Sequence, residues 1–269
     1  MKKELVVLIL QYNSSNLTMQ LLESIERYEA DYINSYRFIL MDNASKKNDF
    51  DKISVEYPWI ELVEFDENLG FAKAHNKIME SVDEKWILLL NNDCILINNA
   101  ITETLRNAEN RDCDFATCDI RNEDLTFQNN CSLIPAPLNR VLFNLTGITR
   151  FISFTRRYKS RSKVGFITGA FLLVKENSIP DGLLFDEKYF MYTEDLDLML
   201  RFSKKKAKGY RFSSGKCIHL GGKSARKLWD DIEIEKIKRA QALSCMYEHY
   251  PKWQVKLMCV LYKIVGKSF

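Results

Sequence analysis

Trp86-Ile-Leu-Leu-Leu-Asn-Asn-Asp93 is a short apolar run that stops abruptly in three polar residues. A run this short and this apolar is typical of a β-strand that is covered on both faces. In open α/β sheets, ligands bind just beyond the carboxyl ends of such strands. The stretch therefore predicts a buried strand over Trp86–Leu90 that delivers Asn91, Asn92 and Asp93 to a binding site. One carboxylate with two amides suits a hard divalent cation that shares its shell with substrate phosphates. The same residues are also ordinary turn formers, so a plain turn is the alternative.

Alternating strands and helices around this run predict an α/β fold with a mostly parallel sheet. Helical spacing of apolar residues predicts one helix that Asn16 caps and another over Gly70–Ser81. Further strands are predicted at Leu5–Leu10, Arg37–Met41, Ile60–Glu64 and Phe115–Cys118. Such alternation means βαβ units. Because right-handed crossovers bring the strand ends to one edge, we expect three polar clusters to converge there. These clusters are Gln11–Asn13, Asp42–Asn43 and Asn91–Asp93.

Length and composition exclude several classes of protein. A chain of 269 residues with 46% apolar residues, 5 Pro and 10 Gly predicts one globular domain, or one domain with an appendage. The seven cysteines form no CxxC pair, which argues against zinc ribbons and thioredoxin-like motifs and indicates reduced thiols in a cytosolic protein. The absence of GxxxxGK[ST] and GxGxxG motifs argues against P-loop and dinucleotide folds. The first apolar run is too short for a signal peptide or a membrane span.

Basic residues gather in two segments of a chain whose net charge is only +3. Asn139–Lys163 contains seven basic residues and no acid, and Lys236–Phe269 contains seven against Glu248 alone. The remainder of the chain is therefore acidic, and the two segments predict an anionic partner. Nucleic acid and an anionic membrane surface are the candidates. No nucleic-acid recognition motif is present, so we expect no nucleic acid and favour the membrane.

A series of motifs in a fixed order resembles the family-2 glycosyltransferases with a GT-A fold. The resemblance covers roughly residues 4–225 and is closest to the rhamnosyltransferase-like and galactofuranosyltransferase-like branch. Its motifs are Val6–Asn13, Met41–Ser45, Glu67–Asn76, Leu88–Asp93, Thr168–Val174, Phe185–Leu198, Arg201, Gly209–Arg211 and His219–Ser224. The resemblance implies a Rossmann-like, nucleotide-binding GT-A domain over 1–225, with a basic insertion at about 131–164. A helical, basic and amphipathic segment would follow over 226–269.

This resemblance implies an inverting glycosyltransferase. The enzyme would move a hexosyl or deoxyhexosyl group from a UDP or dTDP sugar to a hydroxyl of a growing bacterial cell-surface glycan, such as capsule or O-antigen, on a lipid-linked acceptor. Its expected location is the cytoplasm, peripheral on the inner face of the cell membrane. The alternative is a catalytically weak GT-A module that binds nucleotide sugars or partners without efficient turnover. That alternative is suggested by Asn91, which stands where the family's Asp-x-Asp metal motif begins.

The resemblance also implies roles for individual residues. Asp195 would be the catalytic base and Glu194 would orient the acceptor. Asp93 and His219 would hold a divalent metal, Mn²⁺ or Mg²⁺, and histidine suits Mn²⁺ better. The nucleotide sugar would be bound by Gln11, Tyr12, Asn13, Asp42, Asn68, Gly70, Lys73, Asn91, Asn92 and Asp93. The alternatives are a turn cap for Asp42, a solvated side chain for Lys73, and carboxylates that complement a helix dipole for Glu194 and Asp195.

The end of the chain predicts a membrane-binding helix that starts at Pro251, a good first helical residue. Lys252, Lys256, Lys263 and Lys267 fall within about 60° of one another at 100° per residue, while Trp253 and Tyr262 favour membrane interfaces. A helix of this kind can lie in the headgroup layer of an anionic membrane. The alternative is a helix packed on the body of the protein or on a second subunit in a homodimer. For the basic segment Asn139–Lys163 we expect a mobile flap or a membrane-facing insertion, with a solvated surface as the alternative.

Overall fold

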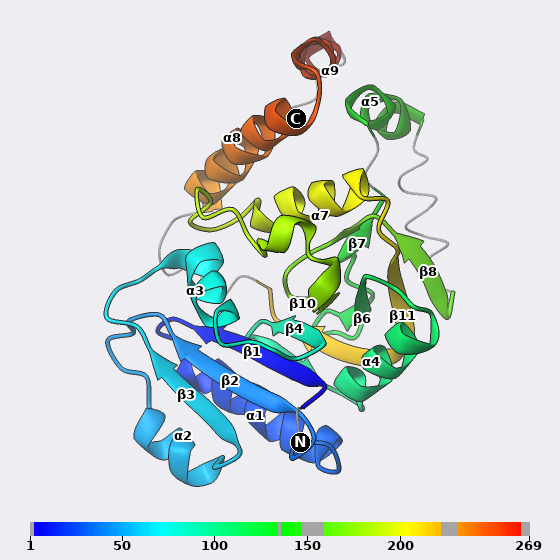
Figure 1. Ribbon diagram of the computed structural model, residues 1–269. Helices are drawn as coiled ribbons and strands as arrows, with labels where there is room; N and C mark the ends of the chain where they lie inside the picture. The colour runs from blue at the N-terminus through cyan, green and yellow to red at the C-terminus, as the bar shows by residue number, and fades with distance from the viewer. Residues whose placement is uncertain (1–2, 134–135, 147–158, 222–230, 265–269) are drawn as a thin grey trace.

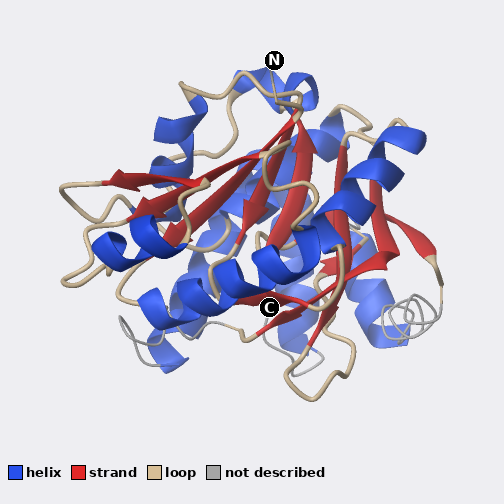
Figure 2. Ribbon diagram, turned by 90° about the horizontal axis from the view of Figure 1, so that it is seen from below, coloured by secondary structure: helices blue, strands red, loops and turns tan. Residues whose placement is uncertain are grey.

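The computed structural model describes residues 3–133, 136–146, 159–221 and 231–264, and the fold is drawn in Figure 1. Within these residues, nine strands form one central sheet in the order β3-β2-β1-β4-β10-β6-β11-β5, with β8 paired to β11. Figure 2 shows this sheet as one layer with helices on both of its faces. The predicted α/β architecture is confirmed.

The first half of the sheet is entirely parallel, as the alternation of elements predicts. Its four strands are β1 (Leu5–Gln11), β2 (Arg37–Asp42), β3 (Ile60–Glu64) and β4 (Trp86–Leu90). The connecting helices are α1 (Ser15–Glu29), α2 (Phe50–Glu56) and α3 (Gly70–Met79). All five residues of β4 are buried, and their side chains alternate between the two core clusters of the sheet. The expectation of a strand covered on both faces is confirmed.

The second half of the sheet is mixed. Strand β10 (Phe171–Lys175) runs antiparallel between β4 and β6 (Phe115–Arg121), so the predicted strand at Phe115–Cys118 is not the neighbour of β4. Strand β11 (Gly209–His219) runs parallel to β6, and both β5 (Cys94–Leu96) and β8 (Arg161–Val164) run antiparallel to β11. A small separate sheet pairs β7 (Cys131–Ser132) with β9 (Phe166–Ile167). Two short 3-10 helices, η1 (Glu176–Ser178) and η2 (Pro180–Gly182), follow β10.

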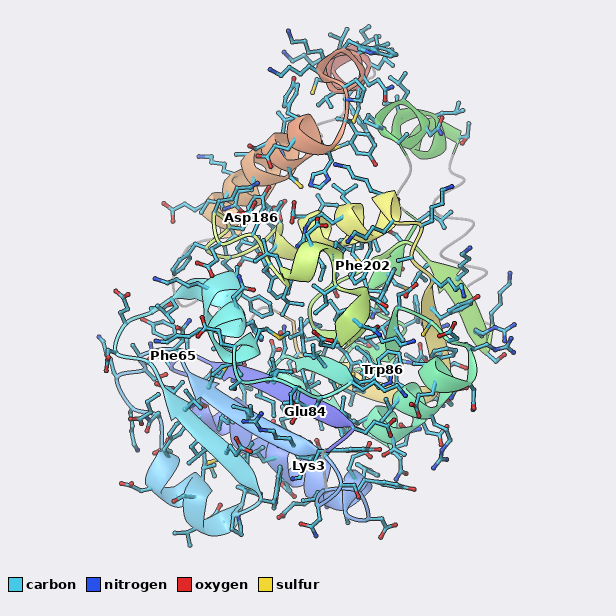
Figure 3. All side chains as sticks on the ribbon, in the orientation of Figure 1. Lys3, Phe65, Glu84, Trp86, Asp186 and Phe202 are labelled. Carbon is cyan, nitrogen blue, oxygen red and sulfur yellow. The ribbon has the colours of Figure 1, made fainter. Side chains whose placement is uncertain are left out.

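Two sets of helices cover the two faces of the sheet. Helices α1, α2 and α4 (Ala100–Asn110) pack on one face, and α3 and α7 (Glu194–Lys204) pack on the other. Phe202, labelled beneath α7 in Figure 3, places its ring 5.0 Å from that of Phe115 on β6. Full burial of a phenylalanine side chain stabilises the fold by about 1.5–3 kcal/mol. This packing fixes α7, and with it Glu194 and Asp195, over the sheet.

The start of α1 differs from the prediction that Asn16 caps this helix, and that prediction is wrong. The helix begins at Ser15, and Ser14 is the cap residue. The carbonyl of Ser14 accepts a hydrogen bond from the backbone N–H of Leu17, while its hydroxyl accepts one from Asn92. The cap is therefore the residue whose side chain connects the helix to the end of β4.

The C-terminal segment forms two helices, α8 (Asp231–His249) and α9 (Lys252–Ile264), at the upper end of the molecule in Figure 1. Helix α8 packs against α7, and α9 packs against α5 (Pro137–Thr146). Helix α9 begins at Lys252, one residue after the predicted first residue, Pro251. Tyr262, however, is buried between α9 and its neighbours, so the prediction that Tyr262 faces a membrane interface is wrong. Lys267, and residues 147–158 of the expected flap, lie outside the described residues.

In the part of the chain that is described, none of the helices has the length and apolar character needed to cross a bilayer. All seven cysteines are free thiols, in agreement with the expectation of reduced cysteines.

Candidate active site

The polar clusters that end β1 and β2 meet at one edge of the sheet. Gln11 and Asp42 are partners in the parallel register, and Gln11 Nε2 donates a 3.0 Å hydrogen bond to Asp42 Oδ1. Thr18 donates from its hydroxyl to Gln11 Oε1 at 2.7 Å. The second oxygen of Asp42 accepts the backbone N–H of Ser45 at 2.8 Å. Asp42 therefore caps the turn after β2. It also lies at the edge of the sheet where the nucleotide is predicted to bind, with its carboxylate hydrogen-bonded to Gln11.

The third cluster, at the end of β4, joins the same network. Asn92 is buried and donates from Nδ2 to the hydroxyls of Ser14 at 2.7 Å and Thr18 at 3.0 Å. Tyr12 and Asn91 are half-buried at this edge. Among the residues predicted to bind the nucleotide sugar, Gln11 and Asn92 use their side chains in hydrogen bonds that stabilise this edge of the sheet. Tyr12 and Asn91 have partly exposed side chains.

Asn13 ties the loop after β1 to the loop after β2. Its φ is +51°, a left-handed conformation that asparagine tolerates better than most residues. The backbone N–H of Asn13 donates to the Ser45 hydroxyl at 2.7 Å, and its side-chain oxygen accepts the N–H of Lys46 at 2.9 Å. The two loops that the sequence assigns to the nucleotide are held together by Asn13.

The loop before α3 brings to this edge of the sheet a second group of residues predicted to bind the nucleotide sugar. Asn68 Oδ1 accepts hydrogen bonds from Asn43 Nδ2 at 2.8 Å and from the N–H of Gly70 at 3.0 Å. Gly70 has φ +74°, and a Cβ on it would lie 2.3 Å from the carbonyl oxygen of Phe190. Glycine is required here because the Phe190 loop approaches so closely. Lys73 is exposed, with its Nζ 3.9 Å from Glu67.

Asp93 and His219 face each other across two paired strands. His219 is the register partner of Cys94, which directly follows Asp93, and the N–H of Leu220 donates to the Asp93 carbonyl at 3.0 Å. This pairing leaves Asp93 Oδ1 3.3 Å from His219 Nε2. Both of these atoms are buried and lack a hydrogen-bond partner. The register of β5 and β11 therefore builds the pair that the sequence predicts as metal ligands.

Gln128 fixes the orientation of the His219 ring. Its Oε1 lies 2.8 Å from His219 Nδ1 and can accept the Nδ1–H, so Nε2 is the ring nitrogen that faces Asp93. Gln128 Nε2 donates to Asn122 Oδ1 at 2.9 Å and to the His219 carbonyl at 3.2 Å. Burial lowers the pKa of His219, but its close contact with Asp93 and the charges of Asp93 and Cys217 together raise it by more, so the net shift is upward. An oriented imidazole nitrogen beside a carboxylate oxygen is a fitting pair of ligands for a divalent cation.

Two carboxyl groups open helix α7. Burial, followed by the charge of Asp195, raises the pKa of Glu194 to about 8, and its Oε2 is buried without a hydrogen-bond partner. Burial also raises the pKa of Asp195 to about 6, although backbone N–H groups of Leu196 and Gly169 oppose this shift. The raised pKa favours the protonated form of Glu194, which can donate a hydrogen bond. Asp195 is a carboxylate that can accept a proton, as a general base must.

The segment leading into these carboxyl groups has an unusual backbone. Tyr192 and Thr193 have φ values of +70° and +74°, although neither is glycine. Gln241 on α8 holds this segment, since its side-chain nitrogen faces two acceptor carbonyls, those of Met191 and Tyr192, each at 3.0 Å. Lys238, one turn earlier on α8, places its Nζ 4.8 Å from the centre of the Tyr192 ring, and its charge lowers the pKa of Asp195. Helix α8 thereby takes part in shaping the site.

A second group of possible metal ligands lies deeper between α7 and α8. The ligand atoms of Asp197, Cys245 and His249 lie within 4.8 Å of one another. Both oxygens of Asp197 are already used, one by His249 Nε2 at 2.7 Å and one by Arg201 Nε at 2.7 Å. Burial raises the pKa of Cys245 to about 12, so its thiol stays protonated. These contacts join the two helices and leave neither oxygen of Asp197 free for a metal.

Sequence reasoning missed three residues that shape the site. Gln128 lies in a polar stretch without a motif, and no sequence signal singles it out. Lys238 and Gln241 lie beyond residue 225, outside the region of resemblance. The acceptors of Gln241 are backbone carbonyls, which any sequence supplies.

Comparison with known proteins identifies relatives of both the sequence and the fold. Rhamnosyltransferase WbbL of Escherichia coli (strain K12) is 24% identical over 205 residues, which are 73% of this chain and 76% of the relative. Mannosyltransferase PcManGT from Pyrobaculum calidifontis, solved in complex with GDP-Man and Mn²⁺, matches with a TM-score of 0.61 at 13% identity, over 99% of this chain and 76% of that chain. S. aureus TarS 1–349, solved with UDP-GlcNAc, matches with a TM-score of 0.59 at 14% identity, over 90% of this chain and 66% of that chain.

These structural matches show that the chain has a GT-A glycosyltransferase fold. The sequence model of the family described as "Glycosyl transferase family 2" matches residues 6–181, which include β1–β4, Asp42 and Asp93. The chain belongs to glycosyl transferase family 2.

Proposed function

We propose that this glycosyltransferase is an inverting enzyme that moves a sugar from a nucleoside-diphosphate sugar to a hydroxyl of a growing cell-surface glycan. The observation that carries the proposal is the buried pair of Asp93 Oδ1 and His219 Nε2, 3.3 Å apart, neither with a hydrogen-bond partner. A buried carboxylate oxygen and a lone-pair nitrogen repel each other unless a proton or a cation lies between them. A cation at this edge of the sheet would meet a diphosphate bound beyond the strand ends.

Asp93 and His219 would hold the divalent cation, with Gln128 fixing the ring that offers Nε2. A bound Mn²⁺ or Mg²⁺ stabilises negative charge on a departing diphosphate without any proton transfer. The Mn²⁺ in the PcManGT complex supports this choice of cofactor. Asn91, where the family's motif has a carboxylate, offers a carbonyl oxygen without charge, so Asp93 would be the charged ligand from the loop after β4.

Asp195 would take the proton from the acceptor hydroxyl. A single carboxylate base supports direct displacement at the sugar carbon, with inversion, because no covalent sugar intermediate is needed. Glu194 would orient the acceptor: its neutral carboxyl group can donate to a sugar oxygen, and its Oε2 lacks a hydrogen-bond partner in the protein. The two residues share one turn of α7 but differ in protonation at neutral pH, which suits them to different roles.

The donor would be a nucleoside-diphosphate sugar, with UDP or dTDP as the carrier. The nucleotide sugars in the PcManGT and TarS complexes support the class of donor, and the relation to WbbL supports a deoxyhexose such as rhamnose among the sugars to be tested. Tyr12, Asp42, Asn68 and Lys73 would contact the nucleotide or its phosphates. A lipid-linked acceptor for capsule or O-antigen, and action at the inner face of the cell membrane, remain predictions.

The test is the release of nucleoside diphosphate from a panel of UDP and dTDP sugars, with and without a glycan acceptor, in Mn²⁺, Mg²⁺ or EDTA. We expect release that depends on acceptor, on metal and on Asp93, so that Asp93→Asn and EDTA both abolish it. Undiminished turnover in EDTA would refute the metal site. Tight binding of a nucleotide sugar with no release under any condition would favour the alternative, a module that binds without turnover.

A further inference from the structure

Helix α9 exposes a line of large apolar side chains that its packing does not use. Trp253, Leu257, Val260 and Ile264 are 60%, 41%, 51% and 74% exposed. They are spaced at i, i+4, i+7 and i+11, so they form one stripe along the helix. Single exposed apolar residues are ordinary on protein surfaces, but a stripe of four that includes a tryptophan marks an interaction surface.

The stripe is not the face by which α9 packs on the protein. Val255, Met258 and Tyr262 occupy a different face and are buried in a cluster with Val141 of α5 and Met246 of α8. The helix is therefore already anchored on the body. Helix α9 lies at the upper end of the molecule in Figure 1, and Figure 3 shows side chains projecting from it at that end.

A row of exposed lysines runs beside the stripe. Lys252, Lys256 and Lys263 fall within a sector of about 40°, and the apolar stripe is centred about 90° further round the helix at 100° per residue. Helix α9 contains no acidic residue. Long lysine side chains can bury their methylene stems and still reach charged groups at the edge of an apolar layer. The exposed surface is thus apolar along one line and cationic along the next.

We propose that α9 docks on an anionic membrane surface, with its apolar stripe in the headgroup–acyl boundary and its lysines at the lipid phosphates. Charge complementarity favours an anionic membrane over a second copy of the chain as the partner of α9. A second copy of the chain, paired through the same stripes, would bring two lysine rows together with no acid on either helix to compensate them. An anionic bilayer offers both an apolar layer and negative charge, which is what an interfacial helix binds. The docking does not depend on the proposed reaction.

The test uses the full chain and vesicles of phosphatidylglycerol with phosphatidylcholine, compared with phosphatidylcholine alone. We expect sedimentation with the anionic vesicles at low salt, and much less with the neutral ones or at high salt. Each lysine near such a surface strengthens binding several-fold, so replacing Lys252, Lys256 and Lys263 by Gln should weaken binding by about 10²-fold. Trp253→Glu with Val260→Glu should abolish it.

The matched control is Val55→Glu on α2, an 80% exposed valine at the opposite end of the molecule in Figure 1. This variant should bind vesicles like the unchanged chain. All variants should keep the same thermal unfolding midpoint, and the same rate of nucleoside-diphosphate release with a soluble acceptor, because none of the residues belongs to the site.

Two results would overturn the proposal. The first is that the unchanged chain ignores anionic vesicles at low salt. The second is that light scattering shows a dimer that Trp253→Glu converts to a monomer while vesicle binding is unaffected, which would assign the stripe to a second copy. Failure of glycosyl transfer with intact vesicle binding would count against the proposed function alone.

Discussion

Gln128→Met should weaken binding of Mn²⁺ by about 10- to 100-fold, which is about 1.4–2.8 kcal/mol. Methionine keeps the length of the side chain and removes the oxygen that accepts the 2.8 Å hydrogen bond from His219 Nδ1–H. Two effects follow. The buried Nδ1–H loses its partner, and the ring loses the contact that points Nε2 toward Asp93. Outer-shell partners of metal-ligating histidines act in this way, because they fix the tautomer and the orientation of the ring.

The assay is a titration with Mn²⁺ in the presence of UDP, with free Mn²⁺ followed by electron paramagnetic resonance, so that no turnover is needed. Gln20→Met, an exposed glutamine on α1, is the matched control and should bind Mn²⁺ normally. Gln128→Glu separates the two functions of the side chain, since it keeps an acceptor for Nδ1–H but loses the Nε2 donor to Asn122 and the His219 carbonyl.

If Gln128→Glu binds Mn²⁺ at least as well as the unchanged protein while Gln128→Met does not, the acceptor is the property that matters. Equal affinity in Gln128→Met and the unchanged protein would refute the reasoning about ring orientation. No Mn²⁺ binding by the unchanged protein would remove the metal site itself.

Four further predictions test other parts of the site and the core. Asp195→Asn should lower the rate of transfer by about 10²- to 10⁴-fold while calorimetry shows unchanged donor binding, and activity within a few-fold of normal would remove Asp195 from the role of base. Because burial raises the pKa of Asp195 to about 6, the carboxylate is protonated below that pH, so kcat/KM should fall as the pH drops through about 6, and a flat profile down to pH 5 would contradict this. Arg211→Met removes the 2.6 Å partner of the buried Asp119 Oδ1, while Arg121 still pairs with Asp119 Oδ2. It should therefore lower the free energy of unfolding in denaturant by less than the about 3–5 kcal/mol expected when a buried charge loses every partner, with partial recovery on adding Asp119→Leu, and no loss would show that the Arg211 pair is not needed. Asn92→Ala should lower the free energy of unfolding by about 1–3 kcal/mol because it removes two buried hydrogen bonds, whereas Asn91→Ala should change it by less than about 0.5 kcal/mol. Equal effects would contradict the inference that Asn92 supports the fold through hydrogen bonds and Asn91 does not.

The first half of the fold could be predicted from the sequence because its signals are local. Strands β1, β2 and β4 are short, mostly apolar runs, and a polar residue ends each of β1, β2 and β3 and directly follows β4. Helix α3 was predicted to within two residues at its end. The consecutive strands β1, β2 and β3 are neighbours in the sheet, and β4 returns to lie beside β1, so most of these strands can be placed from periodicity and the handedness of crossovers.

The second half could not be predicted in the same way because its pairings are long-range. Strand β10 inserts antiparallel between β4 and β6, although about fifty residues separate it from β6 along the chain. The pair of Asp93 and His219 was predicted from resemblance. Its geometry depends on the register of β5 with β11, and on Gln128, which reaches His219 from a loop with no recognisable pattern. Hydrogen bonds of this kind depend on tertiary structure, which local sequence does not encode.

The same argument applies to helix α8 and the predicted base. Tyr192 and Thr193 adopt positive φ values that cost about 1–3 kcal/mol each in a non-glycine residue, so they persist only where the surrounding structure holds them. Part of that support comes from Gln241, through two 3.0 Å hydrogen bonds to the segment before Glu194. The position of Asp195 therefore depends on a helix that lies outside the family match of residues 6–181. Family resemblance identifies the carboxylate, but it is the packing of α8 on α7 that positions it.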